Sequence, residues 1–255
     1  MPSILVTNDD GINSPGIRAL TKALKSIGDV YVVAPESEQS AVAHALTMHR
    51  PLCFEKHSAK HYAVNGTPTD CVILGVHKLM PVRPDIIVSG INNGANLGDD
   101  VTYSGTVAAA IEGTLLGIPS VAVSLALGHR RGAGRQEAVN RYREAADIAK
   151  EVALMVIEKG LPADTLVNIN VPECADIKKM LVTRQGRLSY DNAIKELKDP
   201  RGRQYFWIGG GTPKRGPGKD TDIEAVQNGF ISVTPVHLDL TNYKAMKFLQ
   251  EKWKL

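Results

Sequence analysis

The sequence predicts an α/β fold, because short apolar runs of strand length alternate along the chain with segments of helical periodicity. The first 35 residues already show this alternation: an apolar run at residues 4–6, a helical pattern that ends at Gly28, and a second apolar run at residues 30–34. A strand, a helix and a strand in that order form the repeating unit of a parallel sheet. A chain of 255 residues is long for one domain and short for two. We therefore expect a three-layer, Rossmann-like, mostly parallel sheet with a C-terminal β-hairpin and helix extension.

The other elements of the core follow in chain order. Ser14 and Thr67 each precede a proline, an arrangement typical of an N-cap followed by the first residue of a helix. The runs at residues 45–52 and 62–64 are expected at an edge of the sheet. In all, helices are predicted at residues 15–27, 67–80, 104–117 and 137–159, and later strands at residues 45–52, 62–64, 85–89, 119–125, 165–171 and 230–236.

The composition of the chain changes after residue 177. Gly, Pro, Lys and Arg dominate residues 178–219, which predicts an extension with a long hairpin that includes residues 204–208. In the tail, Ala245, Leu249 and Trp253 are spaced by four and form a helical stripe that needs another surface to cover it. We therefore divide the chain into an α/β core at 1–177, a hairpin region at 178–229, and a closing strand with a C-terminal helix at 230–255.

Composition and charge narrow the class of protein. Apolar residues make up 43% and charged residues 22%, as in an ordinary globular protein, and the net charge of +3 indicates no stable nucleic-acid binding. Cys53, Cys71 and Cys174 lie far apart without CxxC spacing, so we expect neither a disulfide framework nor a zinc site, and we expect a cytoplasmic location. The chain begins without a signal-peptide pattern and has no apolar run of roughly 18 residues, so we expect neither export nor a membrane span.

Polar side chains follow several strands of the predicted sheet. Asp9 and Asp10 come after the first strand, Ser40 follows the second, and Asn92 follows the strand at 85–89, while Ser104-Gly105-Thr106 opens a helix. The carboxyl ends of parallel strands meet at one edge of a sheet, where ligands bind. Carboxylate, hydroxyl and amide oxygens suit Mg²⁺, Mn²⁺ or Ca²⁺, and the start of a helix attracts anions. A divalent cation beside an anion site indicates phosphate chemistry.

Each of these motifs also has a structural interpretation. Asp-Asp-Gly and Asn-Asn-Gly are common in turns, and Ser-Gly-Thr is a common start of a helix. Their coincidence at one sheet edge favours a metal-binding role for Asp9 and Asp10, whereas for Ser40 and Asn92 the sequence pattern alone leaves both interpretations open. His44 is interpreted as a surface or hydrogen-bonded histidine. The sequence has no GxSxG, Walker or HExxH motif, so serine hydrolase, P-loop kinase and zinc protease chemistry have no support.

Motifs along nearly the whole chain resemble one known family, the SurE (survival protein E) nucleotidases. The order and the spacing of the motifs are kept from the first strand to the closing strand. The matching stretches are residues 4–11 (ILVTNDDG), 34–40, 66–70 (GTPTD), 88–92 (VSGIN), 94–96, 103–106 (YSGT), 168–172 and 221–235. The sequence departs from the family pattern at Asn93 and at Ala43-His44-Ala45, in loops expected to contact substrate.

The resemblance implies a 5′/3′-nucleotidase, an acid-phosphatase-like phosphomonoesterase that hydrolyses nucleoside 5′- and 3′-monophosphates and in some cases short polyphosphate. It implies one divalent metal ion per subunit, Mg²⁺ or Mn²⁺, with Ca²⁺ possible in crystals. The metal ligands carried over by motif are Asp9, Asp10, Ser40 and Asn92, and the phosphate-binding residues are Asn96, Ser104, Gly105 and Thr106.

The expected mechanism is metal-assisted attack by water, with Asp9 and Asp10 as the catalytic residues. A phosphorylated Asp9 or Asp10 ranks second, because the pair is adjacent and has no dedicated acid two residues further on. The resemblance also implies a homodimer or homotetramer with exchanged C-terminal arms. A different class of function is a non-catalytic nucleotide- or phosphate-binding regulator, which would need the anion site but not the paired carboxylates.

Overall fold

The computed structural model describes residues 1–255 except 127–134, 175–176, 192–193, 210, 217 and 254–255. Its main sheet has nine strands in the order β3-β4-β2-β1-β5-β6-β7-β13-β8. The central strands β2, β1, β5, β6 and β7 are parallel, and β13 runs antiparallel to β7. The strand bounds are β1 Ser3–Thr7, β2 Asp29–Pro35, β3 Phe54–Ser58, β4 His61–Val64, β5 Ile86–Asn93, β6 Ser120–Ala126, β7 Thr165–Pro172, β8 Met180–Val182 and β13 Ile231–His237.

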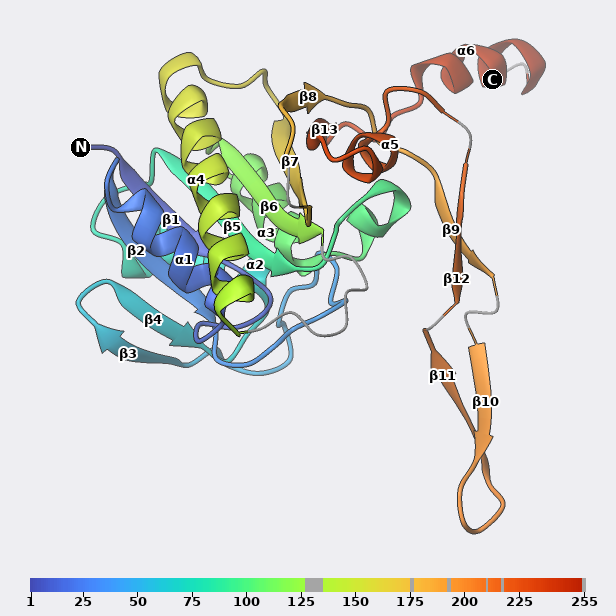
Figure 1. The fold of residues 1–255 in the computed structure, drawn as a ribbon, viewed down its shortest axis with the longest axis horizontal. Coiled ribbons are helices and arrows are strands. Elements are labelled where there is room, and N and C mark those ends of the chain that lie inside the picture. The colour runs from blue at the N-terminus through green and yellow to red at the C-terminus, as the bar shows by residue number, and fades with distance from the viewer. Residues whose placement is uncertain (127–134, 175–176, 192–193, 210, 217, 254–255) are drawn as a thin grey trace.

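Helices cover both faces of the sheet, which confirms the predicted three-layer α/β fold (Figure 1). Helices α1 (Pro15–Leu24) and α4 (Arg135–Lys159) pack together on one face, and α2 (Pro68–Leu74) and α3 (Gly105–Leu115) pack together on the other. Within the described residues, no helix is both long enough and apolar enough to cross a membrane.

Strand β1 lies at the centre because its side chains are apolar on both faces. Ile4 and Val6 belong to the core cluster under α1 and α4, whereas Leu5 belongs to the cluster under α2. All three side chains are fully buried. Because side chains alternate between the two faces of a strand, β1 packs against both helical layers. This packing fixes the position of the strand that Asp9 follows.

The predicted caps start the helices that follow β1 and β4. The Ser14 hydroxyl accepts the Ile17 N–H at the start of α1, and Thr67 and Asp70 form a capping box at the start of α2. Such caps satisfy backbone N–H groups that have no partner in the first helical turn.

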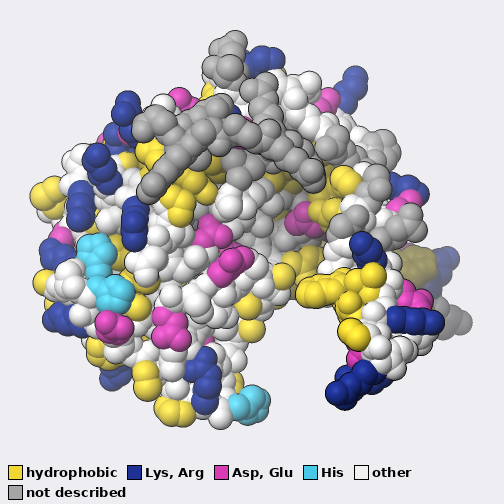
Figure 2. Space-filling model, turned by 60° about the horizontal axis from the view of Figure 1, so that its bottom comes forward, with side chains coloured by type: hydrophobic (Ala, Val, Ile, Leu, Met, Phe, Trp, Pro, Cys, Tyr) yellow, Lys and Arg dark blue, Asp and Glu magenta, His cyan; other side chains and the backbone are white. Residues whose placement is uncertain are grey.

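The C-terminal part contains a long arm, as the sequence predicted. Strands β10 (Ile194–Lys198) and β11 (Gln204–Ile208) pair antiparallel, and so do β9 (Leu188–Asp191) and β12 (Thr212–Arg215). Figure 1 shows this ribbon extending away from the core. Helix α6 (Tyr243–Trp253) lies in the opposite direction from the end at which the ribbon joins the core. Hydrophobic side chains gather along one side of the arm (Figure 2).

Three predicted elements differ from the structure. Residues 45–52 are not a strand, because Pro51 has no N–H to pair and the side chain of Met48 is 76% exposed; the edge strand is β3 instead. Strand β5 continues beyond residue 89 to Asn93, because Asn92 and Asn93 still pair with β6. Helix α2 ends at Leu74, and a π-helical turn (Gly75–Leu79) follows.

The region after residue 177 also holds two elements that the composition did not indicate. Strand β8 pairs with β13, so it belongs to the main sheet. Helix α5 (Asp222–Gln227) begins at Thr221, whose hydroxyl accepts the Glu224 N–H.

Candidate metal and phosphate site

The structure brings the predicted loops together at the carboxyl edge of the sheet. The Gln39 N–H donates to the Asp9 carbonyl at 2.7 Å, which joins the loop of Ser40 to the end of β1. The Asn93 N–H donates to the Asp10 carboxylate at 3.0 Å, which joins the end of β5 to the same place. The carboxyl ends of β1, β2 and β5 therefore converge around the two carboxylates.

The start of α3 forms the fourth side of this site. The Thr106 hydroxyl donates to the Asp9 carboxylate, and the Ser104 hydroxyl caps the helix by accepting the Val107 N–H at 3.1 Å. A Cβ atom at Gly105 would lie 2.8 Å from the Asp9 Cβ, so only glycine allows the helix to approach this closely. The predicted anion site thus lies directly against Asp9.

Among the described residues, no basic side chain forms an ion pair with either carboxylate. Burial raises the pKa of Asp9, and the Thr106 hydroxyl opposes this rise. Burial, together with the charge of Asp9, raises the pKa of Asp10 to about 6, and the charge of Glu38 raises the pKa of both groups further. Because Asp9 is only 5% exposed, water screens this repulsion poorly. A divalent cation between the carboxylates would relieve it.

Ser40 and Asn92 can offer neutral oxygens to such a cation. The Ser40 hydroxyl donates its proton to the Glu38 carboxylate at 2.6 Å, so the lone pairs of its oxygen can coordinate a cation. The Asn92 side-chain amide donates to the Gly94 carbonyl at 2.9 Å, so its Oδ1 atom is the one suited to a metal. The described residues contain no cluster of three or more His, Cys, Asp or Glu side chains suited to a metal, so hydroxyl and amide ligands would have to complete this site.

Asn96 is more deeply embedded than its sequence position suggests. Its N–H donates to Asn170 Oδ1 at 2.8 Å, its Nδ2 donates to the Ser124 hydroxyl at 2.8 Å, and its carbonyl accepts from Asn168 and Asn170. These partners lie on β6 and β7 and hold the loop after β5 in place. The phosphate-binding role of Asn96 stays a prediction. Asn168 and Asn170 are polar residues within the otherwise apolar run of β7, and this pattern in the sequence could have indicated the network.

Several contacts around the site involve residues to which the sequence analysis gave no role there. His44 Nε2 lies 2.8 Å from Glu112 Oε2 on α3, which confirms its interpretation as a hydrogen-bonded histidine. The Ala43 N–H also donates to the Tyr103 carbonyl at 3.2 Å. Together these contacts dock the loop after Ser40 onto α3. Tyr142 of α4 is buried, and burial together with the charge of Asp10 raises the pKa of its hydroxyl to about 12.

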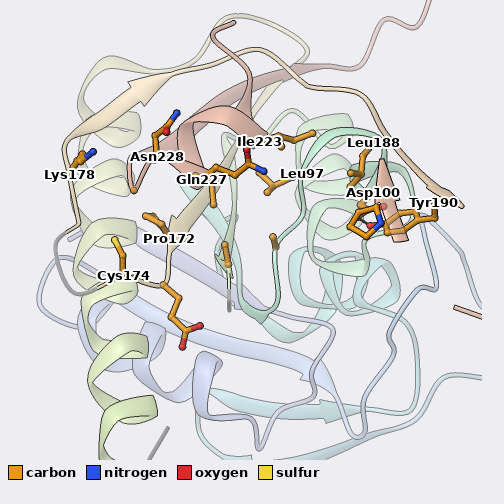
Figure 3. A pocket seen from close by; sticks show the side chains of 16 residues that line it. Leu97, Asp100, Pro172, Cys174, Lys178, Leu188, Tyr190, Ile223, Gln227 and Asn228 are labelled. Carbon is orange, nitrogen blue, oxygen red and sulfur yellow. Dashed lines mark hydrogen bonds between the residues drawn. The ribbon is translucent and has the colours of Figure 1, made fainter. Parts of the chain in front are cut away.

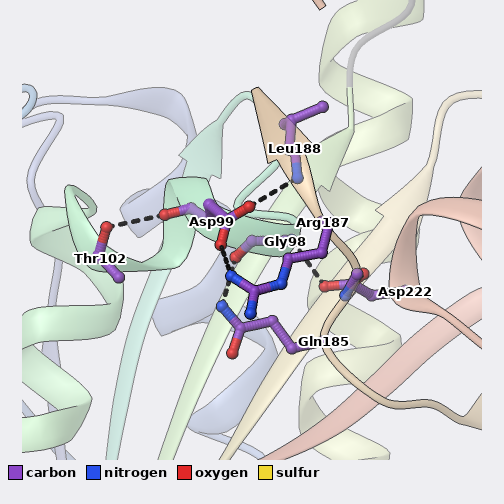
Figure 4. A network of polar contacts seen from close by, with 8 residues as sticks. Gly98, Asp99, Thr102, Gln185, Arg187, Leu188 and Asp222 are labelled. Atoms are coloured by element: carbon purple, nitrogen blue, oxygen red, sulfur yellow. Dashed lines mark hydrogen bonds and ion pairs between the residues drawn. The ribbon is translucent and has the colours of Figure 1, made fainter. Parts of the chain in front are cut away.

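A second polar network attaches the root of the arm beside the site (Figure 4). The buried Asp222 carboxylate accepts the Gly98 N–H at 2.9 Å and the Gly186 N–H at 2.8 Å. The Asp99 carboxylate accepts the Leu188 N–H at 2.7 Å. Gly98 and Asp99 belong to the 3₁₀ turn Gly98–Thr102, which ends two residues before Ser104. The arm root is therefore bound to the segment that leads into α3.

Comparisons with known proteins agree with this architecture. The family model described as survival protein SurE matches residues 4–192. A protein of Pelobacter propionicus named 5′-nucleotidase SurE is 55% identical over 248 residues, which are 96% of this chain and 97% of that protein. Another of the same name, from Geobacter sulfurreducens, is 52% identical and covers 99% of this chain and 94% of its own.

A solved structure shows the same likeness at the level of the fold. The crystal structure of the SurE protein from Aquifex aeolicus matches with a TM-score of 0.84 and 43% sequence identity. The match covers 99% of this chain and all of that one. By sequence and by fold, the chain belongs to the survival protein SurE family.

Proposed function

We propose that this protein is a nucleotidase, a divalent-metal-dependent phosphomonoesterase that hydrolyses nucleoside 5′- and 3′-monophosphates and releases phosphate. The observation that carries the proposal is the contact between Asp9 and Thr106, because it joins paired carboxylates to the start of a helix. The name 5′-nucleotidase of the relatives supports the 5′ activity. Short polyphosphate is a further proposed substrate, because it presents similar terminal phosphate groups.

One divalent ion per subunit, Mg²⁺ or Mn²⁺, fits the oxygen donors of Asp9, Asp10, Ser40 and Asn92. Ca²⁺ has the same preference for oxygen and could occupy the site in crystals. When bound, such an ion neutralises phosphate charge and lowers the pKa of a coordinated water. The carboxylates of Asp9, which is buried, and of Asp10, which is half-buried, would hold the ion because it offsets their mutual repulsion.

The start of α3 would bind the phosphate group. Ser104, Gly105 and Thr106 present backbone N–H groups at the positive end of the helix dipole, and the Ser104 hydroxyl, which accepts the Val107 N–H, keeps its own proton for a phosphate oxygen. Asn96 would support the neighbouring loop from the side of β6. We propose in-line attack by water, because Asp9 and Asp10 are adjacent and no dedicated acid follows two residues further on.

Phosphate release from nucleoside monophosphates tests the proposed function. AMP and 3′-AMP are incubated with the protein and Mn²⁺ or Mg²⁺, with and without a chelator. We expect metal-dependent release of phosphate from both. A non-catalytic nucleotide- or phosphate-binding regulator would bind AMP in a calorimeter and release no phosphate, and that result would replace the proposal.

We also propose that the protein is cytoplasmic and assembles as a homodimer or homotetramer that exchanges its C-terminal arms. Trp207 and Ile208 on the arm and Trp253 on α6 are 64%, 86% and 65% exposed within one chain. Apolar surface of this kind gains stability when a second copy covers it. Sedimentation at micromolar concentration tests this proposal, and a monomer would contradict it.

A further inference from the structure

The two loops that reach the proposed metal site from β5 and from β2 are supported in different ways. In the loop after β5, Leu97 lies beside Ile223, and both line a cavity of about 700 Å³ (Figure 3). Asn96 in the same loop is bonded to β6 and β7. By contrast, residues 41–47 in the loop that carries Ser40 lie outside every helix and strand, and none of them is buried. Hydrophobic packing therefore contributes little to the position of the Ser40 loop.

The backbone of the Ser40 loop also adopts an unfavourable conformation. Ala41 and Ala43 have φ angles of 56° and 52°, in the left-handed region that residues with a Cβ atom rarely occupy. A loop with this conformation and little hydrophobic packing would relax to another shape if nothing else held it. Specific contacts with the neighbouring helices must therefore keep it in place.

Two hydrogen bonds attach the loop to α3. The Ala43 N–H donates to the Tyr103 carbonyl at 3.2 Å, and His44 Nε2 lies 2.8 Å from Glu112 Oε2. An ionised carboxylate only accepts hydrogen bonds, so Nε2 carries the proton of this bond. The side chains of His44 and Glu112 are 34% and 12% exposed, so water competes only in part for the bond. Because α3 starts at the proposed phosphate site, the bond joins the loop of Ser40 to that helix.

Two further hydrogen bonds attach the loop to the start of α2. The Thr67 hydroxyl donates to the Ala45 carbonyl at 2.8 Å, and the Thr47 N–H donates to Asp70 Oδ1 at 3.0 Å. Of these four bonds to the helices, only that of His44 is made by a side chain of the loop, and the others use its backbone. A substitution at His44 therefore removes one bond and leaves the groups that make the other three.

We propose that His44 is a positioning residue of the metal site, which acts by holding the loop of Ser40 against α3 through Glu112. This role rests on the proposed metal-dependent nucleotidase function. The Gln39 N–H, bonded to the Asp9 carbonyl, anchors the loop just before Ser40, and His44 anchors it on the other side. A ligand that is fixed between two anchors loses little freedom when a cation binds, so the second anchor increases the affinity for the metal.

Substitutions of His44 test the proposal through metal affinity. His44→Phe keeps a ring and removes the donor, whereas His44→Gln offers an amide N–H in its place. The matched control is His57→Phe, because His57 Nε2 lies 3.7 Å from Glu55 Oε1 in another His–Glu contact, on the exposed edge strand β3. The readout is the dissociation constant of Mn²⁺ for chelator-treated protein, measured from the signal of free Mn²⁺ in electron paramagnetic resonance.

We expect His44→Phe to raise this dissociation constant about tenfold, which is typical when a group that orients a metal ligand is lost. His44→Gln should stay within about threefold of the wild type, and His57→Phe should not change the constant. In the metal-free protein, hydrogen exchange of residues 41–47 should be faster in His44→Phe than in the wild type, and that of β1 should be the same in both.

A double variant keeps the test valid if His44→Phe melts early because the Glu112 carboxylate has lost its donor. His44→Phe/Glu112→Met removes both partners, so no carboxylate is left unpaired at this place. It should bind Mn²⁺ as weakly as His44→Phe does.

The Mn²⁺ constants also separate this inference from the proposed activity. A wild-type constant in His44→Phe and in the double variant would overturn the positioning role, as would an equal rise in His57→Phe. Equal weakening in His44→Phe and His44→Gln would overturn it too, because the hydrogen bond would then not be the cause. The expected order of constants, in a protein that releases no phosphate from AMP, would refute the nucleotidase function and support the positioning role.

Discussion

The carboxyl edge of the core and the C-terminal arm differ in how their side chains find partners. At the core edge, Asp9 is 5% exposed and the same chain supplies its hydrogen-bond donor, Thr106. On the arm, Trp207 is 64% exposed, in a ribbon that has no hydrophobic core cluster of its own among the described residues. The proposed site is therefore built within one chain, whereas the proposed assembly would cover the arm with a second copy. Substitutions in the two regions should separate activity from assembly.

The largest effect on activity is expected from Asp9→Asn and Asp10→Asn. Each removes one of the two carboxylates proposed to hold the metal, so phosphate release from AMP should fall by about 1,000-fold or more. The melting temperature of the metal-free protein should not fall with Asp10→Asn, because burial and the charge of Asp9, which raise the pKa of Asp10, no longer act on a charged group there. Phosphate release and thermal melting are measured together. Wild-type activity in either variant would refute the site assignment.

A smaller loss is expected from Thr106→Val, which keeps the shape of the side chain and removes the hydroxyl that donates to Asp9. We expect kcat/KM to fall about tenfold, which corresponds to one hydrogen bond of roughly 1.4 kcal/mol. The matched control is Thr102→Val, because the Thr102 hydroxyl donates only to the Asp99 carbonyl on the exposed surface. Equal kinetics for the two variants would show that the contact with Asp9 has no role in catalysis.

The root of the arm, which lies between the two regions, should affect stability more than activity. Asp222→Asn weakens the buried acceptor of the Gly98 and Gly186 N–H groups. A loss of about 2 kcal/mol in the free energy of unfolding would lower the melting temperature by roughly 4–8 °C. Asp99→Asn, at a more exposed position, is the control and should have a smaller effect. A larger loss with Asp99→Asn would contradict the central place of Asp222 in the network.

The smallest effect on activity is expected from changes on the arm itself. Trp207→Ser should raise the dissociation constant of the oligomer about tenfold or more, because large exposed aromatic residues often dominate an interface. Lys195→Ser, on the residue paired with Trp207 across the ribbon, is the control. Sedimentation velocity measures association, and phosphate release per chain should change less than twofold. Loss of activity in proportion to dissociation would show that the site depends on the partner.

The sequence predicted most of the core because each central strand is an apolar run and the starts of α1, α2 and α3 carry local caps. It misplaced the edge strand at residues 45–52, where apolar residues are present but Pro51 and the exposed Met48 leave the segment outside the sheet. It missed α5, because this helix is short and follows a region dominated by Gly and Pro. Local sequence patterns therefore predict a helix or strand well when the residues that stabilise it lie near one another in the sequence.

The part of the candidate site that depends on sheet topology could be predicted from the sequence. Asp9 and Asp10 follow a central strand, so their position at the ligand-binding edge could be derived from the sequence. The bond between Gly98 and Asp222 spans 124 residues, and no local pattern indicates it. The paired hydroxyl of Ser40 and carboxylate of Glu38 likewise became visible only in the structure, because their contact depends on the path of the loop.

One divalent ion, held by the Asp9 and Asp10 loops, is proposed to be required for phosphate release. The direct measurement is a titration of Mn²⁺ into chelator-treated, desalted protein while phosphate release from AMP is followed. We expect no release before metal is added and saturation at one ion per chain, with no response in Asp10→Asn. Full release of phosphate without added metal, or the same titration curve for Asp10→Asn, would contradict it.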